Sequence, residues 1–293
     1  MRLRTLPLSL AGVVCGIMMA YSDGAVTSGW CVLFLLLTTV CLQVLSNMSN
    51  ELGDFLSGTD SENRLGPQYG LTEGGLTEPE LRRLIRCFIV MCCIFGLAML
   101  WAAFGTLWMV QPLALLLLGA AAIWAAMHYT LGKHPYGYHG WGDLFVFIFF
   151  GLVSVMGGYY VVMRTFSSWH VLLPGAAIGF FSVGVLNVNN IRDMITDAAT
   201  RVTVPLKMGE RNAKIYHTIL IVLGWSCMLS YTFSCCQIAT LWSWLYLLVL
   251  PLHIYHVCGV WKLSGRALDS MLPLLVVSTF LMSLLFGIGL MLS

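Results

Sequence analysis

Charged side chains are scarce in this sequence. Of its 293 residues, 15 are Lys or Arg and 13 are Asp or Glu, so charged residues make up 10% of the chain, against about 25% in an ordinary soluble domain. So few charges cannot cover the surface of globular domains of this total length, which excludes a water-soluble fold. The formal net charge is only +2, so the total points neither to a nucleic acid nor to an acidic partner.

The sequence also lacks the spacings that are typical of metal and redox centres. None of its ten cysteines forms a CxxC pair, and its seven histidines show no HExxH pattern. Nearly all of the cysteines lie inside apolar runs, where a thiol behaves as a small hydrophobic side chain. A zinc or redox site is therefore not expected.

Hydrophobic residues, in contrast, make up 59% of the chain. They fall into long runs that are rich in Leu and Val and have no period-two alternation, so helices are expected rather than a transmembrane barrel. A spanning helix needs about 20 such residues, and the first run carries no cleavage signal that would remove it. We predict an all-α integral membrane protein, a bundle of nine transmembrane helices that forms a single polytopic domain over residues 1–293. The nine runs lie near 6–22, 30–50, 86–109, 112–129, 143–163, 170–190, 214–234, 238–259 and 269–292.

The charges are distributed unequally between the two sides of such a bundle. If the nine helices alternate in direction, fourteen of the fifteen Lys and Arg residues lie on one side, and Arg164 lies alone on the other. The Asp and Glu residues show the same asymmetry, since only Asp23 lies on the side that has few Lys and Arg residues. By the positive-inside rule the richer side is cytoplasmic. It also has two long loops, roughly 51–85 and 191–213, and long loops in a compact bundle are usually functional. We therefore predict a cytoplasmic active-site mouth.

Each long loop begins with the same short pattern. Asn50 is followed four residues later by Asp54, and Asn189 by Asp193, so an NxxxD signature recurs after 139 positions. Residues four apart share a helix face, which adds Asp197 to the second set. We interpret the two segments as a pseudo-repeat whose acidic faces look at each other across the mouth of the bundle. It covers residues 50–67 and 189–209.

Four of these acids are expected at one depth, where unpaired like charges are costly. They are Asp54, Asp60, Asp193 and Asp197. Carboxylate and amide oxygens suit magnesium, which usually takes one or two carboxylates together with the phosphate oxygens of a substrate. Two such clusters can bracket a diphosphate. Solvated helix caps are the alternative, but the pattern occurs twice in step and has Arg64, Arg201 and Lys207 close downstream, which favours binding.

Beyond this pattern, the residues resemble a known family. NELGDFLSGTDSENRLGP at 50–67 and NNIRDMITDAATRVTVPLKMG at 189–209 look like the two aspartate-rich motifs of UbiA-type intramembrane prenyltransferases. More narrowly, they resemble the branch that prenylates 1,4-dihydroxy-2-naphthoate in menaquinone biosynthesis. Three more segments agree, so the resemblance spans nearly the whole chain: RTLP at 4–7, YTLGKHPYGYHGWGDLFVFIFFG at 129–151 and VSVMGGYY at 153–160.

Some positions depart from the family's patterns. Glu51 stands where this branch usually has Asp, which puts the role of that residue as a ligand in question. Asp60 follows Asp54 by six residues instead of the four of the wider family, a spacing that resembles the naphthoate branch. In the second motif Pro205 and Lys207 replace a small residue and Arg, and the cation is kept.

The resemblance implies a reaction and a set of site residues. A polyprenyl chain would pass from polyprenyl diphosphate to 1,4-dihydroxy-2-naphthoate with loss of carbon dioxide, giving demethylmenaquinol and diphosphate in the cytoplasmic (inner) membrane of a bacterium. Asp143 is a candidate to orient or deprotonate a ring hydroxyl, with a helix N-cap as the alternative, and Arg64 a candidate to hold the acceptor carboxylate. The implied magnesium ligands are Asn50, Asp54, Asp60, Asn190, Asp193 and Asp197. The implied diphosphate contacts are Arg64, Lys133, Arg201 and Lys207.

The isoprenoid tail is expected in a groove that opens to the membrane lipid. Candidate linings are Phe145, Phe147, Phe149 and Phe150, or Tyr159 and Tyr160, with ordinary aromatic packing as the alternative. Two other functions stay open: prenylation of homogentisate or 4-hydroxybenzoate, and a secondary transporter. Transporters tend to place coupling acids near the bilayer midplane, whereas here the acids collect at one face.

Overall fold

The computed structural model describes residues 3–58, 71, 75–235 and 240–293. Within these residues the chain forms nine long helical segments at the positions of the nine predicted runs, some of them built from consecutive shorter pieces. Eight are long and apolar enough to cross a membrane, and the first, with 17 residues, is slightly shorter. The segments are α1 (Leu6–Ser22), α2 (Gly29–Leu56), α3 (Glu78–Phe104), α4 (Val110–His128), α5–η3–α6 (Gly142–Val146, Phe147–Val153, Ser154–Met163), η4–α7 (Trp169–Val171, Leu172–Arg192), α10 (Glu210–Cys235), η5–α11 (Leu241–Val249, Leu250–Lys262) and η6–α12 (Gly265–Ser270, Met271–Leu292).

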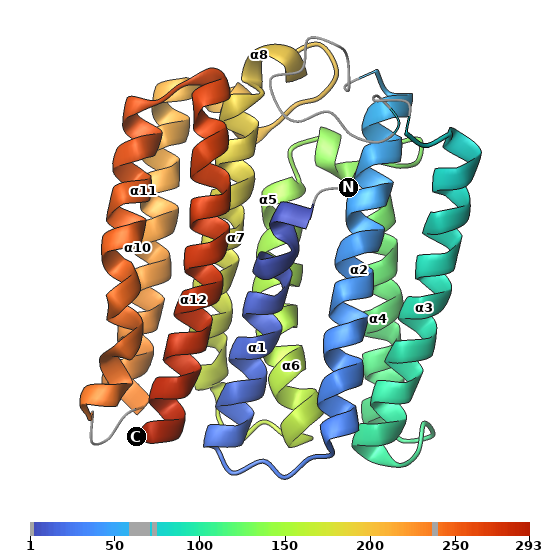
Figure 1. Ribbon diagram of the computed structural model, residues 1–293, viewed down its shortest axis with the longest axis vertical. Coiled ribbons are helices and arrows are strands. Elements are labelled where there is room, and N and C mark those ends of the chain that lie inside the picture. Colours follow the sequence, from blue (N-terminus) through green and yellow to red (C-terminus); the bar gives the residue numbers. More distant parts are fainter. Residues whose placement is uncertain (1–2, 59–70, 72–74, 236–239) are drawn as a thin grey trace.

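These segments confirm the predicted all-helical membrane fold. They run side by side, and the longer connections gather at the end that carries α8 (Met194–Asp197) (Figure 1). We call this the polar end, and it includes the connections 129–141 and 193–209. The opposite end has short connections, such as 23–28 between α1 and α2. Because the acidic motifs lie where α2 and α7 end, both reach the polar end.

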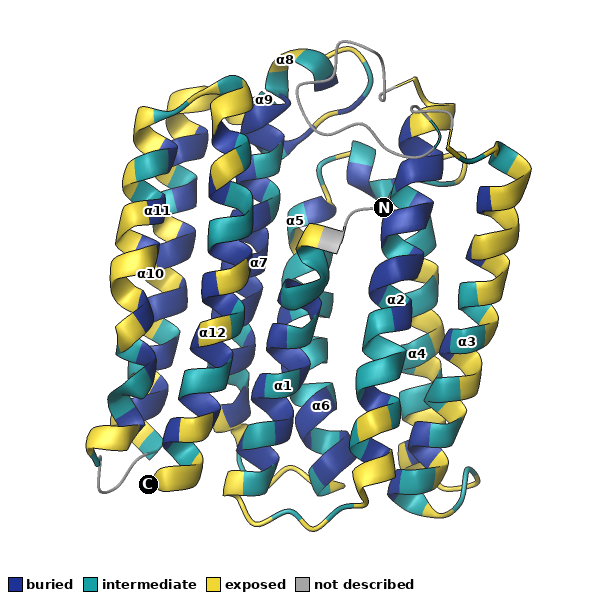
Figure 2. Cartoon of the chain, in the orientation of Figure 1, coloured by how far each residue is buried: buried dark blue, intermediate teal, exposed yellow. Residues whose placement is uncertain are grey.

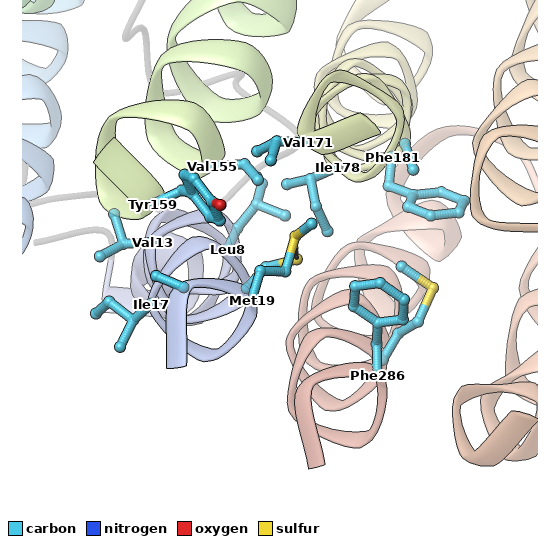
Figure 3. Close-up of a cluster of buried hydrophobic side chains, with 14 of the residues drawn as sticks. Leu8, Val13, Ile17, Met19, Val155, Tyr159, Val171, Ile178, Phe181 and Phe286 are labelled. Carbon is cyan, nitrogen blue, oxygen red and sulfur yellow. Dashed lines mark hydrogen bonds between the residues drawn. The ribbon is translucent and has the colours of Figure 1, made fainter. Parts of the chain in front are cut away.

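The core of the bundle lies where α1, α6, α7 and α12 meet. Figure 3 shows this cluster, with side chains of α1 and α6 facing those of α7 and α12. Tyr159, Tyr246 and Phe181 are its largest fully buried members. Apolar side chains also cover the outside, because α3 exposes Val90, Ile94 and Trp101 (Figure 2). An apolar surface on a fully helical bundle is the arrangement that lipid requires.

Small residues let α1 and α6 approach closely. A Cβ atom at Gly16 would lie 2.1 Å from the backbone oxygen of Val155, and one at Gly12 would lie 2.3 Å from the Ser154 hydroxyl. On the other side of the contact, a Cβ at Gly158 would lie 3.0 Å from the oxygen of Val13. Glycines four residues apart are a common means of close helix packing in membranes. This contact fixes α1 against the middle of the bundle.

The fifth segment is not a uniform helix. Between α5 and α6 the chain takes seven residues of wider π-helical turn, Phe147–Val153. At Gly151 this stretch lies against α7, where a Cβ would meet the Cα of Gly179 at 2.5 Å. π-helical turns are frequent at functional sites, and this one contributes Phe149, Phe150 and Val153 to the cavity described next.

Candidate functional site

A cavity of about 380 Å³ extends from the polar end into the middle of the bundle. Its polar lining includes Asn50, Asp54, Asn189, Asn190, Arg192 and Arg201. Its deeper lining is apolar and includes Leu8, Val13, Leu35, Leu115, Phe149 and Val161. A site that is polar at one end and apolar along its length suits an amphiphilic ligand with a charged head.

The first motif occupies the last turns of α2. Asn50 and Asp54 both line the cavity, as their spacing of four residues predicts. The Asp54 carboxylate is fully buried and accepts a hydrogen bond of 2.9 Å from the hydroxyl of Tyr138. Thr130 donates to the Ser49 carbonyl oxygen at 2.9 Å and lies 3.3 Å from Asn50 Oδ1. The connection after α4 therefore holds both motif side chains from the opposite wall.

The second motif begins in the last turn of α7. The Arg192 side chain, 3% exposed, donates to both carboxylate oxygens of Asp193, from Nε at 2.8 Å and from Nη2 at 2.6 Å. Its Nη1 reaches Asp269 Oδ1 at 2.6 Å, and Nη2 also donates to Asn189 Oδ1 at 2.9 Å. Asp269 lies in η6, so this buried arginine ties the motif to the start of α12. A two-pronged contact of this kind fixes orientation as well as charge.

Arg201 connects the two motifs. Its Nη2 lies 2.6 Å from Asp197 Oδ2, and its Nη1 lies 3.9 Å from Asp54 Oδ1. Burial alone would lower the pKa of this guanidinium, but the carboxylates of Asp54 and Asp197 outweigh it and hold the pKa above its ordinary value. Arg201 therefore stays charged in this buried position. The expected meeting of the two acidic faces takes place around this one side chain.

The 129–141 connection packs against the loop of the second motif. The Val202 amide donates to the Tyr138 carbonyl oxygen at 2.9 Å, and His139 and Val202 form a short parallel bridge. The Arg201 guanidinium carbon lies 6.0 Å from the centre of the Tyr138 ring. Tyr138 thus contacts Asp54 with its hydroxyl and Arg201 with its ring, and joins elements that are far apart in the sequence.

The remaining predicted cations occupy different positions. Lys207, on α9 (Val204–Met208), is exposed, and its ammonium group lies 3.4 Å from the position that a Cβ would take at Gly140. Lys133 is also exposed, in the connection after α4, and neither lysine lines the cavity. Asp60 and Arg64 lie outside the described residues, so their expected roles stay predictions.

Asp143 lies in the first turn of α5, beside α10. It is absent from the cavity lining, and its carboxylate accepts a hydrogen bond of 3.0 Å from Tyr216 on α10. The cap position of α5 is occupied by Trp141, so Asp143 is not the N-cap of this helix, and its expected role toward a ring hydroxyl stays a prediction.

Only part of the expected aromatic lining faces the cavity. Phe145, Phe149 and Phe150 line it, whereas Phe147 packs on Phe180 of α7 with ring centres 4.9 Å apart. Tyr159 is fully buried between helices, and its hydroxyl donates to Asp23 at 2.6 Å. Tyr160 lines a second cavity of about 460 Å³, which shares Leu115, Leu118, Val153 and Gly157 with the first.

The donor set at the polar end fits a hard divalent cation in its chemistry. All of its candidate ligands offer oxygen: the amides of Asn50 and Asn190 and the carboxylates of Asp54, Asp193 and Asp197. Two buried arginines, Arg192 and Arg201, face four carboxylates, the fourth being Asp269, so negative charge is in excess. Among the described residues, however, no three His, Cys, Asp or Glu side chains lie close enough to form a metal centre. Magnesium binding would require these carboxylates to turn away from the arginines.

Several residues of the site were not identified from the sequence. Thr130 and Tyr138 lie in the 129–151 segment that supports the family resemblance, but nothing in their spacing indicates which helix they contact. Arg192 and Asp269 are 77 positions apart. Gln43 and Asn47 did leave a signal, because amides at positions 43, 47, 50 and a carboxylate at 54 repeat at helical spacing on one face of an otherwise apolar helix.

Comparison with known proteins agrees with this geometry. The sequence profile of the UbiA prenyltransferase family matches residues 9–285. A 1,4-dihydroxy-2-naphthoate octaprenyltransferase of Escherichia coli is 36% identical over 295 residues, covering 100% of this chain and 94% of the relative. The enzyme of the same name from Mycobacterium tuberculosis is 34% identical and covers 94% of this chain and 88% of the relative.

Two solved structures share the fold. A UbiA homolog from Aeropyrum pernix K1 superposes with a TM-score of 0.70 at 17% identity and covers 100% of this chain and 98% of the other. A UbiA homolog from Archaeoglobus fulgidus, bound to DMAPP and Mg²⁺, gives a TM-score of 0.60 at 14% identity and covers 99% and 98%. At these identities the likeness concerns the fold alone.

Proposed function

The chain belongs to the UbiA prenyltransferase family, and on that premise we propose that it transfers a polyprenyl chain from polyprenyl diphosphate to 1,4-dihydroxy-2-naphthoate, with release of carbon dioxide and diphosphate. The full-length relatives of that name support the choice of acceptor. The structural observation that carries the proposal is the position of Arg201, which draws Asp54 and Asp197 together at the head of a cavity whose depth is apolar.

Magnesium is the cofactor we propose. The residues that would hold it are Asn50, Asp54, Asn190, Asp193 and Asp197, together with Asp60. When bound, the metal would neutralise the diphosphate and make it a better leaving group. The magnesium-bound homolog from Archaeoglobus fulgidus is consistent with this choice.

The basic residues would complete the diphosphate site. Arg201 lines the cavity and already lies between the two motifs, so it would contact phosphate oxygens once the carboxylates turn to the metal. Lys207 and Lys133 are exposed at the same end and would reach the diphosphate from outside, and Arg64 is proposed with them. Cations around the leaving group stabilise the negative charge that develops on the diphosphate as the allylic C–O bond breaks.

The tail would extend into the apolar depth of the cavity. Phe145, Phe149 and Phe150 line this part, and aromatic faces also stabilise allylic cations. The second cavity lies between α4 and α6 and shares lining residues with the first. Together they would form a continuous apolar path toward the lipid. A cavity with such an outlet accepts a chain longer than its own length.

The acceptor chemistry follows from the ring. The electron-rich naphthoate attacks the allylic carbon from the ring carbon that bears the carboxylate, which leaves that carbon without aromatic bonding. The C–C bond to the carboxylate then breaks, carbon dioxide leaves, and its electron pair restores the aromatic ring. Diphosphate departs with the electrons of the C–O bond.

A turnover assay in detergent tests the proposal. The protein is given polyprenyl diphosphate, magnesium and, separately, 1,4-dihydroxy-2-naphthoate, homogentisate or 4-hydroxybenzoate. We expect product only, or much faster, with the naphthoate, and release of label from its carboxyl group. A prenylated product that keeps the label, or a preference for another acceptor, would contradict the proposed acceptor. Solute flux in vesicles without any turnover would favour a transporter.

We also propose that the polar end faces the cytoplasm of a bacterium. The asymmetric distribution of Lys and Arg supports this orientation. Both substrates carry charged groups. In this orientation the site would open to the cytoplasm, from which the metal ion would enter and into which the released diphosphate would leave.

A further inference from the structure

The cavity has a polar wall that the diphosphate site does not use. Below Asn50, the same face of α2 carries Asn47 and Gln43, and both line the cavity together with Thr5 of η1 (Leu3–Thr5). Gln43 Nε2 donates to Thr5 Oγ1 at 2.8 Å and to Asn47 Oδ1 at 3.2 Å. We call Arg4, Thr5, Gln43 and Asn47 the α1–α2 wall. The part of the lining that comes from α4 and η3, which we call the α4–η3 wall, is apolar.

Amides inside a membrane helix are costly and usually mark a function. Gln43 and Asn47 are each 5% exposed, and a hydrocarbon tail offers them no hydrogen bond. An aromatic ring with two hydroxyl groups does. The two walls therefore differ in chemistry: the α4–η3 wall suits a hydrocarbon tail, and the α1–α2 wall suits a polar ring.

Arg4 is the cation of this wall. Its side chain is 57% exposed and makes one ion pair, from Nη1 to Asp269 Oδ2 at 2.7 Å. Arg192 and Arg201 also line the cavity, but their side chains are only 3% and 6% exposed and are engaged with the motif carboxylates. Of these three arginines, Arg4 has the greatest freedom to bind an anionic group of a ligand.

Asp269 gives Arg4 a fixed place relative to the second motif. It binds Arg4 through Oδ2 and Arg192 through Oδ1, and Arg192 holds Asp193. The four side chains form a continuous chain of ion pairs from η1 to the end of α7. A carboxylate bound by Arg4 is thereby set at a defined distance from the diphosphate site.

We propose that the α1–α2 wall is the acceptor site, with Arg4 binding the naphthoate carboxylate and with Gln43, Asn47 and Thr5 bonding to the ring hydroxyls. This inference rests on the proposed function. A planar guanidinium suits bidentate binding of a carboxylate, and hydroxyl groups match amides that donate and accept. In this arrangement the carboxyl-bearing carbon of the ring would lie on the side of Arg4 and Asp269, which is the side joined to the second motif through Arg192.

The test compares acceptors with and without the carboxylate. For wild type, Arg4→Gln and Gln43→Met, three constants are measured in detergent: the KM for 1,4-dihydroxy-2-naphthoate, the KM for polyprenyl diphosphate, and the inhibition constant of 1,4-dihydroxynaphthalene, which lacks the carboxylate. Arg4→Gln is expected to raise the naphthoate KM about tenfold or more, the loss of one charge-assisted contact. The other two constants should stay within about twofold of wild type.

Gln43→Met should behave differently. It removes hydrogen bonds to the ring hydroxyl groups, which the naphthoate and 1,4-dihydroxynaphthalene have in common. The KM for the naphthoate and the inhibition constant of 1,4-dihydroxynaphthalene should therefore rise together. The KM for polyprenyl diphosphate should not rise. Arg266→Gln is the matched control, because Arg266 is an exposed arginine in η6 at the same end, and it should change none of the three constants.

Two further variants separate binding from tethering. Asp269→Asn removes the ion pair but leaves the Arg4 guanidinium, so it should raise the naphthoate KM less than Arg4→Gln does. If Arg4→Gln raises all three constants alike, or if Asp269→Asn reproduces it, Arg4 is only a tether and the inference is wrong. If Arg64→Gln alone shows the carboxylate-selective pattern, the carboxylate is held there instead. Failure of the proposed function is distinct, since wild type itself would then not convert the naphthoate.

Discussion

At the scale of single residues, the acids of the two motifs are held by specific neighbours. Asp54 is bound by Tyr138 and lies near Arg201, and Asp193 is bound by Arg192. Both carboxylates are buried and paired. Metal binding would therefore exchange these pairings for metal contacts, so the neighbours that hold the acids also affect how readily the site binds a metal ion.

Removing either acid should abolish most of the activity. Asp54→Ala and Asp193→Ala are each expected to lower kcat/KM by about a hundredfold or more, because the loss of a metal ligand at a charged leaving group forfeits several kcal/mol. Turnover at saturating magnesium measures the effect in membrane-inserted protein. Glu78→Gln on the surface of α3, whose partner is Arg82, is the control. Half of wild-type turnover in either Ala variant would refute the shared-diphosphate arrangement.

Tyr138→Phe should have a smaller and more specific effect. The variant loses the hydroxyl that donates to Asp54, and a hydrogen bond to a charged group contributes about 1.5–3 kcal/mol. We expect a reduction in kcat of about tenfold or more together with a higher magnesium requirement. A magnesium titration of initial rates measures both. Tyr255→Phe, at a side chain 64% exposed on α11, should match wild type, and an unchanged magnesium dependence of Tyr138→Phe would contradict the role.

At the scale of elements, the close contact of α1 with α6 positions the α1–α2 wall. Gly16 lies in the middle of this contact, where the backbone of Val155 leaves no room for a side chain. Arg4 and Thr5 lie in η1, directly before α1. Any movement of α1 away from α6 would therefore also move one wall of the cavity.

Gly16→Ala is expected to destabilise the bundle. The added Cβ would lie 2.1 Å from a backbone oxygen, and overpacking of this kind typically costs about 1–3 kcal/mol. Thermal unfolding in detergent, followed by the loss of monodisperse protein, should occur at a lower temperature than for wild type. Gly96→Ala on α3, where no atom lies within 4 Å of the new Cβ, should not lower it. Equal melting of the two variants would show that the α1–α6 contact relaxes without cost.

At the scale of the whole molecule, the polar end gathers three chain segments that come from opposite parts of the sequence. The end of α2, the connection 129–141 and the loop 193–209 meet at Asp54, Tyr138 and Arg201. All nine helices must insert in the predicted order for this meeting to occur, so the topology and the site are linked.

The proposed topology can be tested by labelling. In a background without cysteine, Thr200→Cys at the polar end should resist an impermeant thiol reagent added outside intact cells, and Val26→Cys, at a residue 82% exposed in the short connection after α1, should react. Opening the cells should make Thr200→Cys react as well. Reaction of Thr200→Cys in intact cells would show that the polar end faces outward, opposite to the proposed orientation.

The sequence by itself determined the fold class and the location of the chemistry. Hydrophobic runs of spanning length without period-two alternation leave helices as the available structure in lipid, and this pattern is local to each run. The two NxxxD motifs can likewise be recognised in the sequence alone. Helical spacing puts Asn50 and Asp54 on one face of their helix, however the rest of the chain folds.

Only the tertiary structure decided which side chains of different helices contact one another. The spacing of Asp143 fits a site residue equally well, but its helix turns it toward Tyr216, and no local pattern reports that direction. Arg192 and Asp269 meet across 77 positions, and Arg4 meets Asp269 across 265. Contacts of this kind depend on how whole helices pack, which is set by the sum of many weak side-chain contacts and not by the residues that finally meet.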